Sequence, residues 1–401
     1  MRALHAWQND QHIGVFTEES GAISFAYDSA EDGLPISLSL PRRGGWSSDA
    51  PAHFLDNLLP DNPNVREAMR SRLRTESTDP FDLLEGVDAT GGLTFTSTEN
   101  PPAATTTIRR ADDDEIANDI DRIGRLRNYW WDEQAPCRFS LGGSQGKFTL
   151  TMIDGHWYWP SASLPSTHIV KPSPDSLPEL LEVEAATMRL AELCGLPVPE
   201  HGILSVEGRE AYLVERFDRR IERGRILRVR QEDFQQALGR PAREKYEPTV
   251  DDCLDLLLGA DPSQGLAWQW MERLAFNVSS ADSDAHAKNY SLLLDPETGL
   301  RLSPVYDAVA TRFWVQFDQE LAMPLDEDAQ FAEWTDPSHW EALAERHGMD
   351  GERAADMARH MAGLALHNMD AALAGCGPAV ADRLRTCWTK ANESIQPIAP
   401  Q

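Results

Sequence analysis

The stretch SSADSDAHAKNYSLLL, residues 279–294, decides which fold we expect for this chain. It places Asp284 and Asn289 five residues apart, and Tyr306 and Asp307 follow at the far end of a segment that predicts a β-hairpin. Transfer of a phosphoryl group from ATP to a hydroxyl needs a carboxylate that accepts the hydroxyl proton. It also needs oxygen ligands that hold magnesium on the phosphates. Protein-kinase catalytic loops place Asp and Asn at this spacing, whereas the DxHxxN pattern is closer to that of lipid kinases. The stretch therefore predicts the active site of a kinase.

Each polar residue of this set has a predicted role. We assign Asp284 as the catalytic base, and Asn289 and Asp307 as magnesium ligands. His286 and Lys288 are predicted to contact the phosphates or to stabilise the transition state. The alternative is a polar loop whose side chains cap helices and turns. The hairpin and the second aspartate favour the kinase interpretation.

A glycine-rich segment, SLGGSQGKFTL at residues 140–150, lies between two predicted strands. Gly142, Gly143 and Gly146 allow the backbone to approach phosphates, and Lys147 can add its charge. The segment is not a Walker A loop, because Phe148 stands where that motif has Ser or Thr. An ordinary glycine-rich turn is the alternative to a phosphate-binding loop.

Two further segments complete the predicted nucleotide site. Lys171 ends the strand-like run THIVK, where a kinase has the lysine that pairs with phosphate, and Glu184 on the next predicted helix is its expected partner. The alternative is an exposed strand end and an exposed helical glutamate. The strand AYLVERF at 211–217 has the position of a hinge, whose backbone would bond adenine while Phe217 covers the ring.

The distribution of patterns predicts an α+β, two-lobed protein-kinase-like fold with a mixed-β N-lobe and a mostly helical C-lobe. Strand-like runs (HIGVFTEE, AISFAYD and ISLSL) alternate with turns in the N-terminal part, and helical periodicity dominates beyond Gln231. A helix between Ala52 and Leu73 must break at LLPDNP, which contains two prolines. We expect an N-terminal subdomain and linker at 1–107, an ATP-binding N-lobe at 108–220, and a helical catalytic lobe at 221–401.

The composition limits the possible partners and compartments. The formal net charge is −28, which disfavours independent binding to nucleic acid and suits a basic protein partner. Five scattered cysteines form no CxxC pair, and no run approaches the ~20 apolar residues of a membrane span. These features favour a cytoplasmic protein. Seven arginines between Arg216 and Arg230 predict either a solvated hairpin with local ion pairs or a contact with a phosphate or an acidic partner.

Together these segments resemble the HipA family of bacterial toxin kinases. The matching pieces occur in the family's order, up to about residue 310. They are FLDNLLPDN, SLGGSQGKF, THIVKP, LCGLPVPE, YLVERFDR, RQEDFQQALG, KYE, SDAHAKNYSLLL and LSPVYDA.

The resemblance implies a Mg·ATP-dependent serine/threonine protein kinase that acts as the toxin of a toxin–antitoxin pair and is linked to persistence. Its target class would be a translation factor such as an aminoacyl-tRNA synthetase. Its partner would be a helix-turn-helix antitoxin (HipB-like), and operator DNA would be bound only through that antitoxin. The residues that the resemblance places around Mg·ATP are Gly142, Gly143, Ser144, Gln145, Gly146, Lys147, Lys171, Glu215, Arg216, Phe217, His286, Lys288, Asn289, Tyr306 and Asp307.

The resemblance also implies inactivating autophosphorylation on the glycine-rich loop, at the position of Ser140. Ser144 replaces a smaller residue of the family and is a second candidate phosphosite, while Gly146 replaces an acidic one. Before Asp284 the chain has SSADS, where GNT is commoner. Asp282 in this segment is predicted to be an exposed neighbour of Asp284, and a paired-carboxylate site is the alternative.

Two rival functions stay open. A small-molecule or lipid kinase would use the same Asp–Asn–Asp set and would phosphorylate a sugar, antibiotic or inositol lipid instead of a protein. A non-catalytic co-repressor would keep the fold and act by binding the antitoxin on DNA, and the arginines between 216 and 230 are the feature that supports it.

Overall fold

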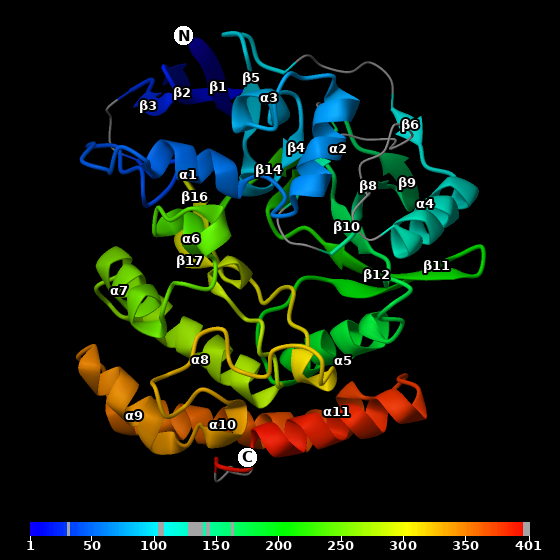
Figure 1. Ribbon diagram of the computed structural model, residues 1–401, viewed down its shortest axis with the longest axis vertical. Coiled ribbons are helices and arrows are strands. Elements are labelled where there is room, and N and C mark those ends of the chain that lie inside the picture. Colours follow the sequence, from blue (N-terminus) through cyan, green and yellow to red (C-terminus); the bar gives the residue numbers. More distant parts are fainter. Residues whose placement is uncertain (30–32, 103–107, 127–138, 142–144, 162–163, 396–401) are drawn as a thin grey trace. The chain divides into compact units, whose positions relative to one another are not determined.

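A computed structural model describes residues 1–29, 33–102, 108–126, 139–141, 145–161 and 164–395 of the protein (Figure 1). The chain divides into two compact units. Unit 1 contains Met1–Pro178, Glu200–Arg243 and Leu292–Arg301, and unit 2 contains Glu179–Pro199, Glu244–Ser291 and Leu302–Gln401. The predicted domain boundaries at 107 and 220 stay a prediction.

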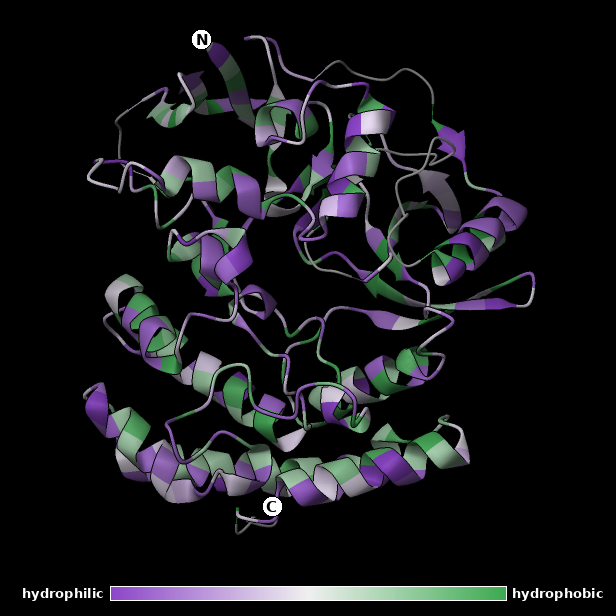
Figure 2. Ribbon diagram, viewed as in Figure 1, coloured by the Kyte–Doolittle hydropathy of each residue, from purple (hydrophilic) through white to green (hydrophobic). Residues whose placement is uncertain are grey.

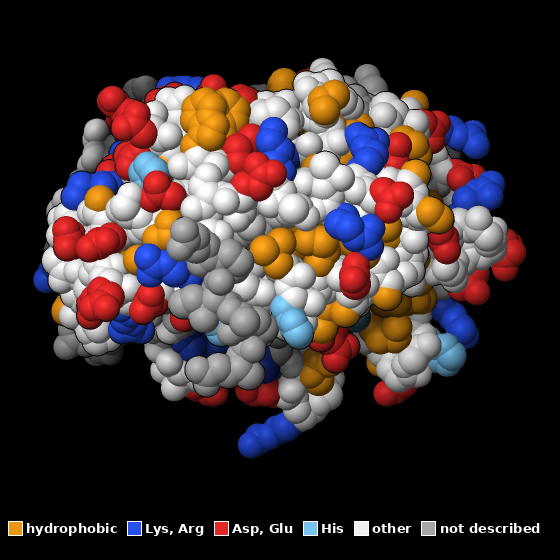
Figure 3. Space-filling model, turned by 90° about the horizontal axis from the view of Figure 1, so that it is seen from below, with side chains coloured by type: hydrophobic (Ala, Val, Ile, Leu, Met, Phe, Trp, Pro, Cys, Tyr) orange, Lys and Arg blue, Asp and Glu red, His pale blue; other side chains and the backbone are white. Residues whose placement is uncertain are grey.

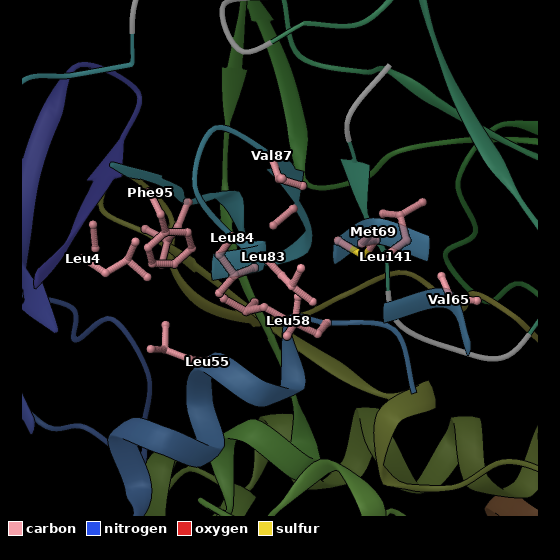
Figure 4. Packing of buried hydrophobic residues seen from close by; sticks show 14 of the residues in the cluster. Leu4, Leu55, Leu58, Val65, Met69, Leu83, Leu84, Val87, Phe95 and Leu141 are labelled. Carbon is pink, nitrogen blue, oxygen red and sulfur yellow. The ribbon is translucent and has the colours of Figure 1, made fainter. Parts of the chain in front are cut away.

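Unit 1 begins with an antiparallel sheet in the order β3-β2-β1-β5. Its strands are β1 (Arg2–Gln8), β2 (Gln11–Glu19), β3 (Ala22–Tyr27) and β5 (Thr94–Thr96). Phe16 on β2 stacks on Phe54 with ring centroids 5.9 Å apart. Figure 4 shows this core, in which buried side chains such as Leu4, Leu58 and Leu141 come together from distant parts of the sequence. The predicted strand-like runs HIGVFTEE and AISFAYD are confirmed as β2 and β3.

The predicted break between Ala52 and Leu73 is confirmed. It separates helices α1 (Ala50–Asn57) and α2 (Pro63–Leu73), and the Asn62 side chain accepts a hydrogen bond from the Asn64 N–H at the start of α2. A proline at the first helical position loses no helical hydrogen bond. Pro63 therefore starts α2, whereas α1 has already ended at Asn57, before Pro60. The short helix α3 (Pro80–Leu83) follows.

The predicted strand ISLSL at 36–40 is wrong. This segment forms turns instead, because the Ser37 hydroxyl and the Leu38 N–H donate to the buried carboxylate of Glu232, at 2.5 and 2.9 Å. A carboxylate from a distant segment thus replaces the strand partner that the alternating pattern suggested.

The second sheet of unit 1 is antiparallel throughout, in the order β11-β12-β10-β8-β9-β6. Its strands are β6 (Arg109–Arg110), β8 (Phe148–Ile153), β9 (His156–Trp159), β10 (His168–Lys171), β11 (His201–Val206) and β12 (Arg209–Glu215). Helix α4 (Asp113–Arg125) packs against β11 and β12 and starts with a capping box between Asp112 and Glu115. The capping box explains the acidic run at this point of the sequence.

Three smaller strand pairings complete unit 1. They involve β4 (Asp88–Ala89) with β7 (Phe139–Ser140), β13 (Arg219–Glu222) with β14 (Arg225–Arg228), and the order β15-β16-β17, from β15 (Arg230–Asp233), β16 (Ser291–Asp295) and β17 (Gly299–Leu302). The predicted hairpin after Asn289 is thus confirmed, and Gly299 adopts the positive φ that its turn requires. The short helix α6 (Phe234–Ala237) follows β15.

Unit 2 is mostly helical. Its helices are α5 (Leu180–Leu193), α7 (Val250–Ala260), α8 (Gly265–Ser279), α9 (Pro337–Arg346), α10 (Gly351–Ala372) and α11 (Pro378–Ala391). Helix α10 contacts α5, α8, α9 and α11, and small residues such as Ala358, Ala362 and Ala365 let its neighbours approach closely. Figure 2 shows polar and apolar residues alternating along α10 and α11, as expected for helices with one buried face.

The charges on the surface and the hydropathy of the helices can be compared with what the composition predicts. Acidic and basic side chains are interspersed over the face shown in Figure 3, without one continuous basic patch. Among the described residues, no helix has the length and apolar character that a membrane crossing requires.

Candidate active site

The loop from Ser280 to Tyr290 carries the predicted catalytic residues and is tied at both ends. The Asn277 side-chain amide donates to the Tyr290 hydroxyl at 2.7 Å, and the Asn392 amide donates to the Ser279 carbonyl at 2.9 Å. Two asparagine side chains, Asn277 and Asn392, therefore hold the two ends of the loop in place. Ala281 lies in the left-handed region with φ 59°, a conformation that favours glycine.

Within the loop, backbone hydrogen bonds set the spacing of the functional side chains. The His286 N–H donates to the Asp284 carbonyl at 2.8 Å, and the Asn289 N–H donates to the His286 carbonyl at 2.9 Å. A 3₁₀ turn at Ala287–Asn289 follows. Asp284 is exposed, whereas His286 is buried. The short turns thus present Asp284 at the surface while they hold the residues after it.

Asp282 and Ser283 bind this loop to the segment after Asp307. Asp282 accepts hydrogen bonds from the Asp284 N–H at 3.1 Å and from the Val309 N–H at 3.4 Å. The Ser283 N–H donates to the Thr311 hydroxyl at 2.8 Å. The expectation that Asp282 is an exposed neighbour was wrong: it is 3% exposed, because its carboxylate joins two backbone segments.

Tyr306 and Asp307 stand where the hairpin returns to the loop. The Tyr306 hydroxyl donates to the Lys288 carbonyl at 2.7 Å and lies 2.6 Å from the Ser291 hydroxyl. Asp307 has φ 58°, a strained conformation for a residue that is not glycine. The loop residues 284–289 and the pair Tyr306–Asp307 are therefore brought together within unit 2.

Three carboxylates of like charge lie in this part of unit 2. Burial raises the pKa of Asp282 well above its ordinary value, and the charges of Asp284 and Asp307 add to the effect. Asp284 is exposed at the surface, yet the protein around its carboxylate removes part of its hydration, and this raises its pKa, with a further contribution from Asp307. The Tyr246 hydroxyl and the Lys245 ammonium act in the opposite sense. Perturbed carboxylates beside one another are typical of functional sites.

The oxygen atoms present here suit magnesium. The Oδ1 atom of Asn289 is buried and has no hydrogen-bond partner among the described residues. An amide oxygen without a donor, in a site with the carboxylate of Asp307, matches the oxygen ligands that Mg²⁺ prefers. Magnesium at kinase sites is held by few protein ligands together with nucleotide phosphates. Asn289 and Asp307 therefore fit a metal ion that is bound together with ATP.

Sequence reasoning did not assign Tyr246, although its segment KYE belongs to the resemblance. The Tyr246 hydroxyl donates to Asp284 Oδ1 at 2.7 Å, and its ring packs edge-on against His286 with centroids 5.0 Å apart. The two segments are separated by 38 positions. No spacing signal connects residues that far apart, so only the fold reveals this contact.

Unit 1 holds the predicted phosphate-binding lysines. Lys171 is buried at the end of β10, with its Nζ atom 5.7 Å from the centroid of the Tyr212 ring, and Lys147 is buried just before β8. Gln145 and Gly146 are described and half-buried. The predicted contacts Gly142, Gly143 and Ser144 lie outside the described residues.

Ser140 is fully buried at the end of β7. Its hydroxyl donates to the Leu58 carbonyl at 2.6 Å, and β7 pairs in parallel with β4. In this arrangement the hydroxyl is occupied by a backbone acceptor and is closed to solvent.

The predicted partner of Lys171 belongs to the other unit. Glu184 is completely buried on α5 of unit 2, so the Lys171–Glu184 pair stays a prediction. Glu215 at the predicted hinge donates its N–H to the Glu200 carbonyl at 2.8 Å, and burial, then the charge of Glu200, raises its pKa. Phe217 follows and is half-buried.

Arg216 belongs to a buried charge cluster of unit 1. Its guanidinium pairs with the carboxylate of Asp218 at 2.8 Å. The carboxylate of Asp88 pairs with the guanidinium groups of Arg219 at 3.0 Å and Arg228 at 2.9 Å. Burial alone would raise the pKa of Asp88, but the three guanidinium groups outweigh it and hold the pKa below its ordinary value. A nucleotide contact by Arg216 stays a prediction, since its guanidinium serves this cluster.

The expected hairpin with local ion pairs is present, but the expectation that it is solvated is wrong for part of it. The side chains of Arg216, Arg219 and Arg228 are only 1%, 2% and 6% exposed. Arg225 at the hairpin tip is exposed and pairs with Asp10 at 2.6 Å. Most of the run is therefore structural, because long-range carboxylates neutralise it inside unit 1.

Known proteins share both parts of this chain. The model of the HipA N-terminal domain matches residues 4–96, and that of the HipA-like C-terminal domain matches residues 139–369. A protein of Sinorhizobium fredii that is named as a kinase is 32% identical over 371 residues, which cover 87% of this chain and 86% of that protein. The serine/threonine-protein kinase toxin HipA of Shewanella oneidensis is 30% identical over 334 residues, which cover 78% of this chain and 75% of that toxin.

A solved structure agrees with these matches. The Shewanella oneidensis HipA chain, in its complex with HipB and operator DNA, superposes with a TM-score of 0.81 at 25% identity. The superposition covers 97% of this chain and 95% of that chain. The predicted α+β, kinase-like fold of HipA type is therefore confirmed.

Proposed function

This chain belongs to the HipA family of kinases, and from that premise we propose that it is a Mg·ATP-dependent serine/threonine protein kinase, the toxin of a toxin–antitoxin pair. The observation that carries the proposal is the arrangement of Asp284, Asn289 and Asp307. The exposed carboxylate of Asp284 stands on a loop that Asp282 ties to the segment after Asp307, and the buried amide oxygen of Asn289 has no donor among the described residues.

The chain's own residues would divide the reaction between them. Asp284 orients the acceptor hydroxyl and takes its proton as the oxygen bonds to the γ-phosphorus and ADP leaves. Asn289 and Asp307 would hold Mg²⁺, which supplies neutralisation of phosphate charge when it is bound. Lys147 and Lys171 would contact the phosphates. The raised pKa of Asp284 suits a group that must accept a proton at neutral pH.

Autophosphorylation of the glycine-rich loop would act as an off-switch. The Ser140 hydroxyl is buried against the Leu58 carbonyl, and a phosphate group is too large and too charged for that position. A phosphate on Ser140 would therefore require β7 to leave β4. Ser144 is the second candidate phosphosite.

The proposed partner is a helix-turn-helix antitoxin of the HipB kind, which carries the contact to operator DNA. The Shewanella relative forms such a complex with HipB and DNA, and the net charge of −28 suits a basic partner. The arginines from 216 to 230 give little support to direct DNA binding, since five of the seven pair with carboxylates of unit 1. The proposed target is a translation factor such as an aminoacyl-tRNA synthetase.

Phosphopeptide mass spectrometry after incubation with Mg·ATP tests the proposal. We expect a phosphate on the 140–144 segment of the wild type and none in Asp284→Asn. The matched control is Asp370→Asn, which changes an aspartate that is 85% exposed on α10 and should leave the phosphate in place. No phosphate in the wild type, together with no stabilisation by Mg·ATP, would favour the non-catalytic co-repressor. Transfer to a lipid or sugar alone would favour the small-molecule kinase.

A further inference from the structure

Tyr246 makes the one side-chain hydrogen bond to Asp284 that we find within the described part of unit 2. Its hydroxyl donates to the Oδ1 atom at 2.7 Å. A carboxylate has two oxygen atoms, and each can accept a proton or a hydrogen bond. With Oδ1 engaged by the phenol, Oδ2 is the oxygen left to receive the acceptor hydroxyl.

The backbone around Tyr246 is fixed by local hydrogen bonds. The Glu247 N–H donates to the Glu244 carbonyl at 3.0 Å, which closes a turn around the tyrosine. Thr249 then caps α7 through a capping box with Asp252, in which the Asp252 N–H donates to the threonine hydroxyl at 3.1 Å. The turn is thus held by its own hydrogen bond and by the start of a helix, so the phenol reaches Asp284 from a defined position.

The ring of Tyr246 contacts His286 and Lys245 and is partly exposed. His286 packs edge-on against it at 5.0 Å, and Lys245 places its ammonium group 5.1 Å from the ring centroid. Even so, Tyr246 is 52% exposed, which is unusual for a large aromatic side chain beside buried residues. An exposed, rigid ring next to a catalytic carboxylate offers a surface to an incoming side chain.

The contact also acts on the charge of the base. A hydrogen bond donated to a carboxylate favours its ionised form, and the ammonium group of Lys245 acts in the same sense. Burial and the charge of Asp307 act in the opposite sense. Tyr246 therefore helps to keep Asp284 able to accept a proton in a site that otherwise favours the protonated acid.

We propose that Tyr246 is a positioning residue for phosphoryl transfer: its hydroxyl fixes Asp284 through Oδ1 so that Oδ2 meets the acceptor hydroxyl, and its exposed ring forms the wall beside which the acceptor side chain enters. This inference rests on the proposed kinase function. It goes beyond that function by assigning a role to a residue 38 positions away from the base.

The first test is the rate of autophosphorylation as a function of pH in Tyr246→Phe, which removes only the hydroxyl. We expect a rate constant about 10- to 100-fold lower, with little change in ATP affinity, because a hydrogen bond to a charged group is lost. The acid limb of the pH profile should move to higher pH, since Asp284 loses a contact that favours its ionised form. Tyr158→Phe, which removes a hydroxyl from β9 in unit 1, is the matched control and should match the wild type.

Three results would overturn the inference. An unchanged or faster rate in Tyr246→Phe would show that the phenol is dispensable or blocks the site. A slower rate with an unmoved acid limb would indicate a structural role alone. A phosphate on Tyr246 itself would make this residue an acceptor instead of a positioning residue.

A second test does not depend on activity. Thermal stabilities of Tyr246→Phe, Asp284→Ala and the double variant form a cycle that measures the coupling of the two side chains. A clear coupling supports the contact, and additive effects would contradict it. The cycle could show coupling while the wild-type protein transfers no phosphate. That result would overturn the kinase proposal and the positioning role of Tyr246 in phosphoryl transfer, but it would support the contact between Tyr246 and Asp284.

Discussion

The loop around Asp284 in unit 2 and the arginine-rich hairpin of unit 1 both concentrate charged side chains. The pKa values of their buried carboxylates are shifted in opposite directions. In unit 1 the carboxylate of Asp88 is buried among three guanidinium groups, and its pKa falls. In unit 2, burial raises the pKa values of Asp282 and Asp284, and neighbouring carboxylates add to the effect. In unit 1 the opposite charges outweigh the effect of burial, whereas in unit 2 the Lys245 ammonium near Asp284 does not.

The difference separates a structural cluster from a site that needs a ligand. A buried ion is tolerated when partners of opposite sign surround it, and removing one partner is then strongly destabilising. Carboxylates that are buried close to one another disfavour their own ionisation, and a bound cation or a proton relieves the repulsion. The arginine run is thus a structural cluster, whereas the acidic loop is the region in which the pKa values of carboxylates are raised.

The largest expected effect is the loss of phosphoryl transfer in Asp284→Asn. Removing a general base typically lowers the rate by about 10²- to 10⁴-fold. Thermal stability should be unchanged or slightly higher, because burial and Asp307 disfavour the charged form of Asp284. ADP release and thermal unfolding, measured on the same preparation, check both parts. A stable variant with wild-type rate would contradict the assignment of the base.

The next largest effect is expected for Asp88→Asn, which leaves three buried guanidinium groups with less negative charge. We expect a loss of about 3–5 kcal/mol in the free energy of unfolding, measured with urea. Asp10→Asn breaks an exposed pair of the same kind, with side chains 79% and 66% exposed, and should cost at most about 1 kcal/mol. Equal effects of the two substitutions would contradict the distinction between buried and exposed pairs.

The pH dependence of this cluster has a defined sign. The pKa of Asp88 in the folded protein lies below its ordinary value of 3.8. Its stabilisation is therefore fully present above that value and is lost only as the pH falls through the lower, folded-state pKa. Asp88→Asn should accordingly be most destabilising at neutral pH.

Asp282→Asn should raise the free energy of unfolding at neutral pH, whereas Asp88→Asn should lower it. The pKa of Asp282 is raised, so the folded state favours the protonated acid, and ionisation above the ordinary value of 3.8 destabilises the protein. An amide removes the charge and keeps one acceptor oxygen, for the Asp284 N–H at 3.1 Å, and gives up only the longer bond from the Val309 N–H at 3.4 Å. We expect a gain of about 1 kcal/mol at neutral pH that shrinks in acid, measured by thermal unfolding at several pH values. A loss of stability at neutral pH would indicate that the charge of Asp282 has a partner in the folded protein.

The smallest effect concerns the backbone of the same loop. Ala281 has φ 59°, a region in which glycine lacks the steric penalty of other residues. Ala281→Gly should raise stability by about 0.5 kcal/mol, since the relief of strain exceeds the added entropy of the unfolded chain. Ala285→Gly, a buried position of the same loop without positive φ, should be destabilising instead. Thermal unfolding of the two variants shows whether glycine stabilises only the position with positive φ.

Much of the fold was predictable because its signals are local. Pro63 marks the start of α2, the acidic run caps α4, and Gly299 makes the turn of the β16–β17 hairpin. The spacing from Asp284 to Asn289 and the position of Asp307 similarly indicated the site that unit 2 brings together.

The remaining features depend on contacts between distant residues. Asp88 meets Arg228 across 140 positions, and Tyr246 meets Asp284 across 38, so no periodicity connects either pair. The alternating run at 36–40 predicted a strand, but the buried carboxylate of Glu232 captures its polar groups. The burial of Asp282 likewise follows from its bonds to two backbone segments.

The most direct test asks whether Asp307 holds magnesium at the site around Asp284. The measurement is the calorimetric affinity of the protein for ATP, with and without magnesium, in the wild type and in Asp307→Asn. Asp370→Asn is the control, because it removes an aspartate from the exposed face of α10. We expect tight binding of Mg·ATP by the wild type and the control, and an affinity at least about tenfold weaker in Asp307→Asn, with the difference abolished when magnesium is absent. An Asp307→Asn variant that binds Mg·ATP as tightly as the wild type would contradict the assignment.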